Sequence, residues 1–143
     1  MVLKRKLIIR ALLIMVVMVI QLIIPWGSFA EDEVLETWNI SKSEEDSVIA
    51  TLYSSGLLVI EGTGEIIEKN YSSSYPWYNL RENVKNIEIG EGITNIPNYA
   101  FYQFSNLSSI NIPESIKNIG NYAFEYCSKL TNITLPNEIT SIG

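Results

Sequence analysis

Very few side chains in this sequence could perform catalysis, because the chain has no histidine and its one cysteine is Cys127. Histidine is the usual proton carrier near neutral pH and a common metal ligand, so its absence excludes most sites of either kind. Glu88 and Glu91 are close in sequence, and paired carboxylates can act as acid and base in glycoside hydrolysis. Nothing in the sequence implies a pocket around them, and we interpret both as solvated surface residues.

Two other short motifs contain residues found in binding sites but lack essential parts of those sites. Gly62-Thr63-Gly64 has no third glycine and no following helix, so it is interpreted as a turn rather than a dinucleotide-binding loop. Glu44-Glu45-Asp46 offers oxygen ligands for Ca²⁺ without the glycine and the ligand spacing of a calcium loop. The sequence therefore predicts no catalytic residue, no cofactor site and no metal site.

The remaining candidates are side chains suited to binding. Tyr99 and Tyr122 occupy matching places in two similar segments, and tyrosine combines an apolar ring with a polar tip that suits contact with proteins or glycans. A purely structural stack of the two rings is the alternative interpretation. The second part of the candidate binding surface is a row of outward-facing polar residues: Asn86, Glu88, Ser109, Asn111, Asn132 and Thr134.

These candidates lie in a segment with a 23-residue repeat that has no gap, and its copies start at positions 84, 107 and 130. The same positions are apolar in each repeat: Ile87, Ile110 and Ile133; Ile89, Ile112 and Leu135; Ile93, Ile116 and Ile139; Ile96, Ile119 and Ile142. One repeat of this length cannot bury its apolar face alone, so successive copies must share a core. The sequence therefore predicts a solenoid over residues 84–143, with two full coils and a partial third.

Each repeat begins with the alternation of polar and apolar residues that is typical of a half-buried strand, as at residues 86–89. A glycine or proline follows at the same place in each repeat, and proline marks a strand end because it cannot donate to a ladder. A second short extended piece is expected at residues 93–96. Residues 98–104 and 121–127 are each expected to form one or two helical turns.

Cys127 stands where the preceding repeat has Phe104, which is an inward-facing apolar position. We therefore interpret Cys127 as a small buried hydrophobic residue. A reactive cysteine needs a basic and partly exposed setting, which this position does not offer.

The second repeat resembles the BspA-like leucine-rich repeat family, whose coils read L-x-x-I-x-I-P-x-x-(V/I)-x-x-I-G-x-x-A-F-x-x-C-x-x-L. The matching residues are Leu107, Ile110, Ile112, Pro113, Ile116, Ile119, Gly120, Ala123, Phe124, Cys127 and Leu130. The first repeat departs from this pattern at Gly90, Pro97 and Phe104. Upstream, residues 50–66 and 71–78 look like the lead-in hairpin and serine-rich loop of such proteins.

The resemblance implies a leucine-rich-repeat-type right-handed solenoid, mostly β with short helical turns and preceded by a β-hairpin. Proteins with these repeats occur on surfaces and among secreted proteins of bacteria and protists, and they are usually assigned to adhesion or protein–protein contact. The motif is specific for fold and weak for function.

Residues 1–30 have the layout of a secretory signal peptide. A basic stretch at residues 1–10 precedes a 14-residue apolar run at 11–24, and small residues at Ser28 and Ala30 predict cleavage after Ala30. The apolar run is short for a membrane span, which needs about 20 residues, and an uncleaved signal anchor is the alternative. We therefore expect a secreted or cell-surface protein whose only membrane contact is through this segment.

The rest of the chain is strongly acidic. The formal net charge is −6 over 143 residues, but residues 31–143 alone contain 6 basic and 16 acidic residues. Such a body is unsuited to nucleic acid, whose phosphates require lysine and arginine. Residues 31–47 are expected to form an acidic flexible lead, and residues 48–83 a β-hairpin N-terminal cap over the first coil.

The far end is expected to be open, because the sequence stops within the third coil at Gly143. Stable repeat arrays need about three repeats and an atypical terminal one. We therefore expect either a truncated reading frame or an open end that pairs with another chain.

Taken together, the sequence favours a non-enzymatic protein-interaction or adhesion module of an exported cell-surface protein. The expected partners are surface proteins or glycans of a host or a neighbouring cell. Two alternatives stay open: a spacer or accessory region of a larger exported enzyme such as a cell-wall hydrolase, and a truncated gene remnant.

Overall fold

Short β-strands build most of the protein in the computed structural model, which describes residues 32–143. Two 3-10 helices, η1 (Ser72–Ser74) and η2 (Tyr78–Asn83), connect the N-terminal strands to the repeats. The signal peptide predicted for residues 1–30 lies outside the described residues. Among residues 32–143, no helix is long and apolar enough to cross a membrane. These residues form one compact unit with its own hydrophobic core.

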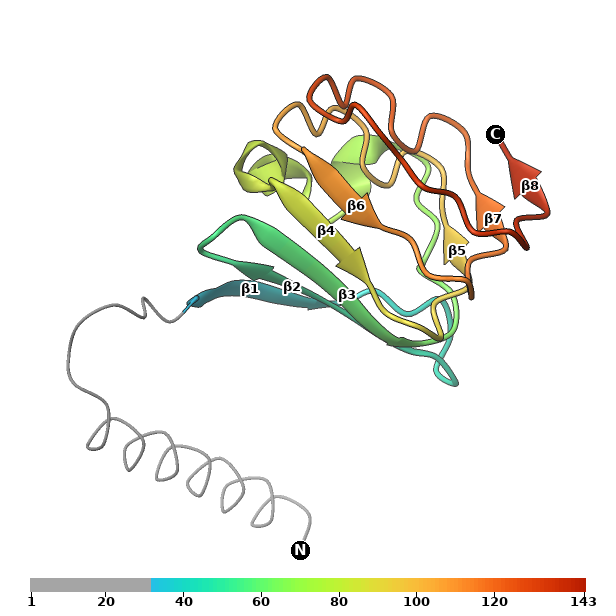
Figure 1. The fold of residues 1–143 in the computed structure, drawn as a ribbon. Helices are drawn as coiled ribbons and strands as arrows, with labels where there is room; N and C mark the ends of the chain where they lie inside the picture. Colours follow the sequence, from blue (N-terminus) through green and yellow to red (C-terminus); the bar gives the residue numbers. More distant parts are fainter. Residues whose placement is uncertain (1–31) are drawn as a thin grey trace, which may run out of the picture. The chain divides into compact units, whose positions relative to one another are not determined.

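The larger sheet combines an antiparallel and a parallel half, in the order β1-β2-β3-β4-β6 (Figure 1). Its antiparallel half contains β1 (Val34–Asn39), β2 (Ser47–Tyr53) and β3 (Leu57–Thr63). Its parallel half adds β4 (Asn86–Ile89) and β6 (Ser109–Asn111). Strands β2 and β3 are the two arms of the hairpin expected from the sequence.

The smaller sheet contains three two-residue strands in parallel, one from each repeat. They are β5 (Asn95–Ile96), β7 (Asn118–Ile119) and β8 (Ser141–Ile142). Asn95 pairs with Asn118, which pairs with Ser141, and in the larger sheet Ile87 pairs with Ile110. The repeat period of the sequence is therefore the strand register between repeats in both sheets, as predicted.

The expected helical turns at residues 98–104 and 121–127 are wrong, because both segments are chains of tight turns. Left-handed φ angles interrupt them at Tyr99 (57°), Gln103 (63°), Tyr122 (58°) and Tyr126 (62°). Such residues cannot continue a right-handed helix. Their backbone donors also point to the neighbouring repeat, since the amides of Tyr99, Phe101 and Gln103 donate to the carbonyls of Asn121, Ala123 and Glu125 at 3.0, 3.0 and 2.8 Å.

Side chains from upstream of the first repeat supply donors to its turn segment. The Tyr75 hydroxyl donates to the Asn98 carbonyl at 2.8 Å, and Trp77 Nε1 donates to the Ala100 carbonyl at 2.7 Å. Burial raises the pKa of Tyr75 to about 12, so its hydroxyl keeps the proton that it donates. The fully buried Trp77 ring also stacks on Phe101, at 5.9 Å between ring centroids.

Residues 31–47 were expected to be flexible, and the structure corrects this for Val34–Asn39, which is an edge strand of the larger sheet. Of residues 34–39 only Glu36 is acidic, and its side chain stays in water while β2 satisfies the backbone. Asp32 accepts hydrogen bonds from the Ser54 hydroxyl and the Ser55 amide at 3.0 and 2.7 Å. The Ser55 hydroxyl and these two donors hold the pKa of Asp32 below its usual value.

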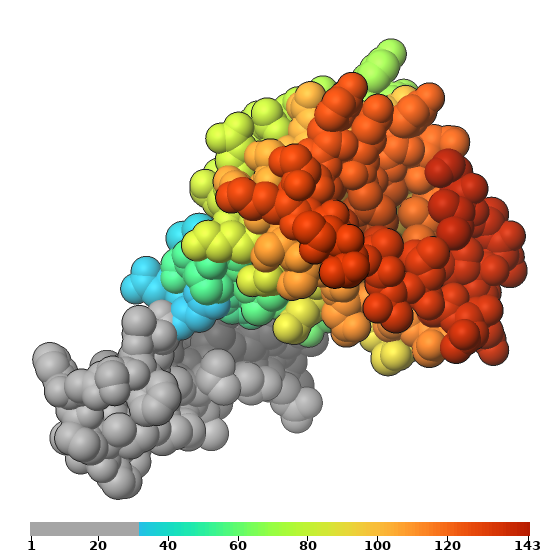
Figure 2. Space-filling model, turned by 45° about the horizontal axis from the view of Figure 1, so that its top comes forward, coloured from blue at the N-terminus to red at the C-terminus, as the bar shows by residue number. Residues whose placement is uncertain are grey.

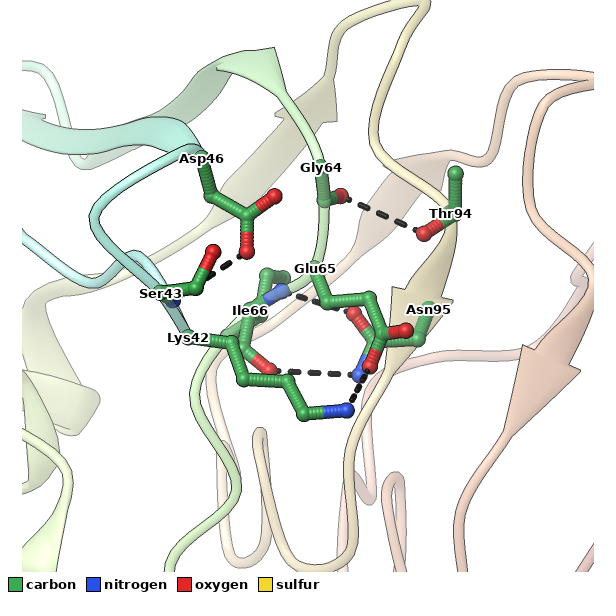
Figure 3. Close-up of polar contacts among 8 residues, drawn as sticks. All are labelled: Lys42, Ser43, Asp46, Gly64, Glu65, Ile66, Thr94 and Asn95. Atoms are coloured by element: carbon green, nitrogen blue, oxygen red, sulfur yellow. Dashed lines mark hydrogen bonds and ion pairs between the residues drawn. The ribbon is translucent and has the colours of Figure 1, made fainter.

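The segment after β3 is joined to the first repeat by side-chain contacts, drawn in Figure 3. The Asn95 side chain accepts from the Ile66 amide at 2.7 Å and donates to the Ile66 carbonyl at 3.2 Å. Lys42 Nζ lies 2.6 Å from Glu65 Oε2, and this ion pair raises the pKa of Lys42. The side chains of Lys42 and Glu65 are both about half exposed, and exposed ion pairs contribute little to stability. The Asn95 hydrogen bonds therefore do more than the ion pair to hold this segment against the first repeat.

The rows of equivalent apolar side chains become more exposed to solvent toward the last repeat. Ile87 is 1% exposed and Ile110 is partly buried, but Ile133 is 39% exposed and no strand forms around it. The expectation that Ile133 joins a buried row is therefore wrong. Within the described residues no further repeat lies over this coil, and Figure 2 shows the last residues, in red, together at one side of the surface.

Candidate functional site

The outward face of β3, β4 and β6 contains a hollow with a volume of about 500 Å³. The strands alternate, so Ile87 and Ile89 enter the core while Asn86 and Glu88 face outward. Five of the six polar residues predicted for the strand face line the hollow: Asn86, Glu88, Ser109, Asn111 and Thr134. Glu88 thus lines a hollow that the sequence did not imply, whereas Glu91 does not line it.

Part of the hollow is fixed by hydrogen bonds between repeats. The Ser109 hydroxyl donates to Asn86 Oδ1 at 2.7 Å, and Ser108 reaches the same oxygen at 3.3 Å. The side chains of Glu88 and Asn111 make no hydrogen bond with any described residue, and both are exposed. The hollow therefore presents one carboxylate and one amide with free hydrogen-bonding capacity, beside a polar wall that is already ordered.

One residue predicted for the strand face is missing from the hollow, and five residues outside that prediction line it: Ser55, Leu57 and the isoleucines Ile87, Ile110 and Ile112. Asn132 lies on an exposed loop outside it, since the third repeat forms no strand there. Ser55 and Leu57, at the hairpin turn and the start of β3, complete the wall. Leu57 pairs with Asn86 in parallel, and the spacing of these two residues along the chain differs from the repeat period. No repeat-based signal in the sequence could therefore have identified them.

The tyrosines form a second surface feature beside the turn segments. Tyr99 and Tyr122 stack with ring centroids 5.1 Å apart, as the alternative structural interpretation predicts. Tyr102 meets Tyr99 edge-on at 5.9 Å and Tyr126 edge-on at 5.5 Å, which makes one cluster of four rings. Tyr122 is 53% exposed and Tyr126 is 62% exposed. Contact of Tyr99 and Tyr122 with a partner stays a prediction.

Cys127 is buried, and its Sγ lies 3.2 Å from the Phe101 carbonyl. Burial raises the pKa of this thiol from 9.0 to about 11. We expect the native protein to react with a thiol reagent at pH 8 about a hundredfold more slowly than the unfolded chain, because the thiolate is the reacting form. The rate of thiol labelling with and without urea measures this. Ser128→Cys, at an exposed neighbouring position, is the control and should label rapidly in the folded protein.

The glycine motif (residues 62–64) and the acidic motif (residues 44–46) lie next to each other in the structure. Gly62 and Gly64 lie at the end of β3 with φ angles of 117° and 109°, against the backbone of Ser47 and the side chain of Asp46. Asp46 accepts a hydrogen bond from the Ser43 amide at 3.2 Å. Among residues 32–143, no three histidine, cysteine, aspartate or glutamate side chains come together in a group that could hold a metal ion.

Comparison with protein families and solved structures gives consistent results. The family model described as BspA type leucine rich repeat region (6 copies) matches residues 71–143. A leucine-rich repeat protein from Eubacterium ventriosum shares 25% identity and a TM-score of 0.66 over 75% of this chain and 27% of its own. One from Bacteroides ovatus shares 25% identity and a TM-score of 0.51 over 82% and 32%. Among the curated proteins, none matches significantly.

The chain is short beside these solved structures, since it covers about a third or less of their length. The likeness covers 75% and 82% of the present chain, which is more than the share that residues 84–143 make up. The comparison is therefore not limited to the repeated motif.

Proposed function

Because this chain belongs to the BspA-type leucine-rich repeat family, we propose that it is a non-enzymatic binding module of an exported cell-surface protein. The resemblance seen in residues 107–130 is confirmed by the family match, and repeats of this kind serve as protein-interaction modules. Adhesion is the finer form of the proposal: the partner is a surface protein or glycan of a host or neighbouring cell. Export is proposed on the signal-peptide layout of residues 1–30.

The hollow on the strand face is the observation that supports this function most strongly. Its volume of about 500 Å³ falls within the usual range for ligand sites. Its free groups, the Glu88 carboxylate and the Asn111 amide, suit hydroxyl and amide groups such as those of glycans and peptide backbones. The paired strands β4 and β6 fix the backbone beneath them, so no backbone ordering is added when a partner binds.

We further propose that the repeats continue the geometry of a right-handed solenoid and that the hairpin caps its first coil. The hairpin strand β3 pairs in parallel with β4, which leaves the first strand of the repeats with a partner on each side. Tyr75 and Trp77 serve the turn segment of the same coil by donating to its carbonyls. Both features are what a cap must supply, since an unpaired strand edge promotes aggregation.

The hollow is tested by binding of residues 32–143 to glycan and matrix-protein arrays. We expect Asn111→Arg to weaken binding about tenfold or more, because its long side chain fills the hollow. Asn132→Arg carries the same change at an exposed position outside the hollow and should bind as the wild type does. Loss of binding in a Tyr99→Ala, Tyr122→Ala double variant, with Asn111→Arg unaffected, would move the site to the tyrosine cluster.

A wild-type protein that binds nothing on either array contradicts the adhesion proposal. The accessory role in a larger exported enzyme is then the better explanation, as is the gene remnant if no fold is detected in solution. Circular dichroism and thermal unfolding of the same samples distinguish these two outcomes.

A further inference from the structure

The charged residues in the strands of the larger sheet are all acidic. Its five strands contain Glu36, Glu61 and Glu88 and no lysine or arginine. Glu88 is the one charged side chain that lines the hollow described above. Neither of the two ion pairs among residues 32–143 includes it. The hollow therefore presents a carboxylate whose charge no described side chain balances by direct contact.

The residues on either side of Glu88 determine what can approach its carboxylate. In the strand register Glu88 lies between Val59 of β3 and Asn111 of β6. Val59 and Leu57 alternate with buried residues along β3 and are partly exposed, so the hairpin side of Glu88 is apolar. The repeat side supplies the Asn111 amide. A ligand thus meets a carboxylate and an amide with an apolar surface beside them.

A partner that covers the hollow removes water from the Glu88 carboxylate. A buried charge without a counter-charge is strongly unfavourable, so the partner must bring a positive charge to this place. A neutral sugar donates hydrogen bonds from its hydroxyl groups but supplies no charge. A basic side chain of a protein supplies both, and its aliphatic stem can lie along the apolar side of the hollow.

Arginine satisfies this arrangement better than lysine does. Its planar guanidinium carries five donors in a fixed geometry, so it can bond the Glu88 carboxylate and the Asn111 amide oxygen at the same time. The lysine ammonium is a compact and strongly hydrated charge, and it loses more hydration when it enters a partly apolar hollow.

Charge beyond the hollow favours the same kind of partner. Residues 31–143 contain 6 basic and 16 acidic residues, so this body attracts a basic protein and repels an acidic one. Such long-range attraction mainly raises the association rate and discriminates between partners. The local charge at Glu88 and the net charge of the body therefore select the same ligand chemistry.

We propose that the ligand of the hollow is an arginine side chain on the surface of a basic protein. Its guanidinium contacts Glu88, and its stem lies against Leu57 and Val59. This inference rests on the proposed function and deepens it, because it names the chemistry that the hollow selects. Acidic proteins, and glycans without a basic group, are the ligands that it excludes.

A pair of matched probes tests the charge requirement. N-acetyl-L-arginine amide carries the guanidinium, and N-acetyl-L-citrulline amide replaces it with a neutral urea of nearly the same shape. Each is titrated into isotope-labelled residues 32–143, whose core lies wholly within this part, while backbone amide signals are followed by NMR. We expect arginine amide to shift the signals of residues 86–88 and 109–111 with a dissociation constant of about 1–10 mM, and citrulline amide to bind about tenfold more weakly.

Glu88→Gln keeps the size of the side chain and removes its charge, so it should weaken the binding of arginine amide about tenfold or more. Glu91→Gln is the matched control, since it removes the same charge from an exposed position outside the hollow. This control should bind arginine amide as the wild type does. Both glutamates are exposed, so both variants should keep the wild-type melting temperature, which thermal unfolding measures.

Three results would overturn the inference: no signal shift with arginine amide, equal binding of the two probes, or unchanged binding in Glu88→Gln. An array partner that Asn111→Arg releases and Glu88→Gln retains also overturns it, while the proposed binding function stands. Binding of arginine amide that depends on Glu88, without any array partner, supports the ligand chemistry and contradicts the adhesion proposal instead. The failure of one is therefore distinguishable from the failure of the other.

Discussion

Replacing Trp77 by alanine is expected to lower the free energy of unfolding by about 3–5 kcal/mol, the largest loss for any single side chain here. Trp77 is fully buried, and it links the residues upstream of the repeats to the first repeat by stacking on Phe101. Its Nε1 also donates to the Ala100 carbonyl at 2.7 Å. Alanine leaves a cavity and an unpaired carbonyl at once. Urea unfolding followed by circular dichroism measures the loss.

Trp77→Phe separates the two contributions. Phenylalanine keeps most of the ring contact with Phe101 but removes the donor to Ala100, so we expect a loss of about 1–3 kcal/mol. If both variants unfold at the wild-type urea concentration, the upstream residues do not stabilise the repeats and the proposed cap is wrong. If Trp77→Phe is as damaging as Trp77→Ala, the hydrogen bond outweighs ring packing.

Replacing Gly62 by alanine is expected to destabilise the fold by about 3 kcal/mol or more. The φ angle of Gly62 is 117°, and a Cβ there would overlap the carbonyl oxygen of Ser47 in the paired strand β2. The overlap is with backbone, which cannot move without breaking the β2–β3 ladder. The midpoint of thermal unfolding is the measurement.

Gly90→Ala is the matched control for this substitution. The nearest atom to a Cβ at Gly90 is the Ile60 carbonyl oxygen at 3.5 Å, an ordinary contact, and its φ is not left-handed. We expect a change of less than about 1 kcal/mol in either direction. Equal melting temperatures for Gly62→Ala and wild type would mean that the end of β3 is not held against β2 as the structure shows.

The repeat register could be predicted from the sequence because it depends on a pattern that occurs more than once. Ile87 and Ile110 hold the same place in successive repeats and are directly paired in space. Apolar residues at equivalent positions of successive repeats pack against each other, so their spacing in the sequence predicts the order and the register of the repeats. The polar face followed from the same alternation, and five of its six residues line the hollow.

The parts of the structure that could not be predicted depend on contacts that do not recur from one repeat to the next. The turn at Tyr99 was expected to be helical because its residues are compatible with a helix, but its amide is taken by Asn121 of the next repeat. Strand Val34–Asn39 lies within a stretch whose many acids predicted a flexible lead, although these six residues include only Glu36, and the free edge of β2 decides their structure. Ser55 enters the hollow through a register that the repeat period does not contain.

The donors that Tyr75 and Trp77 provide have a consequence for how such a gene can lengthen. These two side chains occur once, and they occupy the acceptors on the upstream side of the first repeat. If a duplicated repeat were inserted after Lys129, the turn-segment amides of the repeat before it could donate to its carbonyls, as happens between the first two repeats. A copy inserted before Val84 would present the same two acceptors to Tyr75 and Trp77, because these acceptors are backbone carbonyls rather than side chains. Tandem duplication on either side of the first repeat therefore preserves the contacts of the upstream donors.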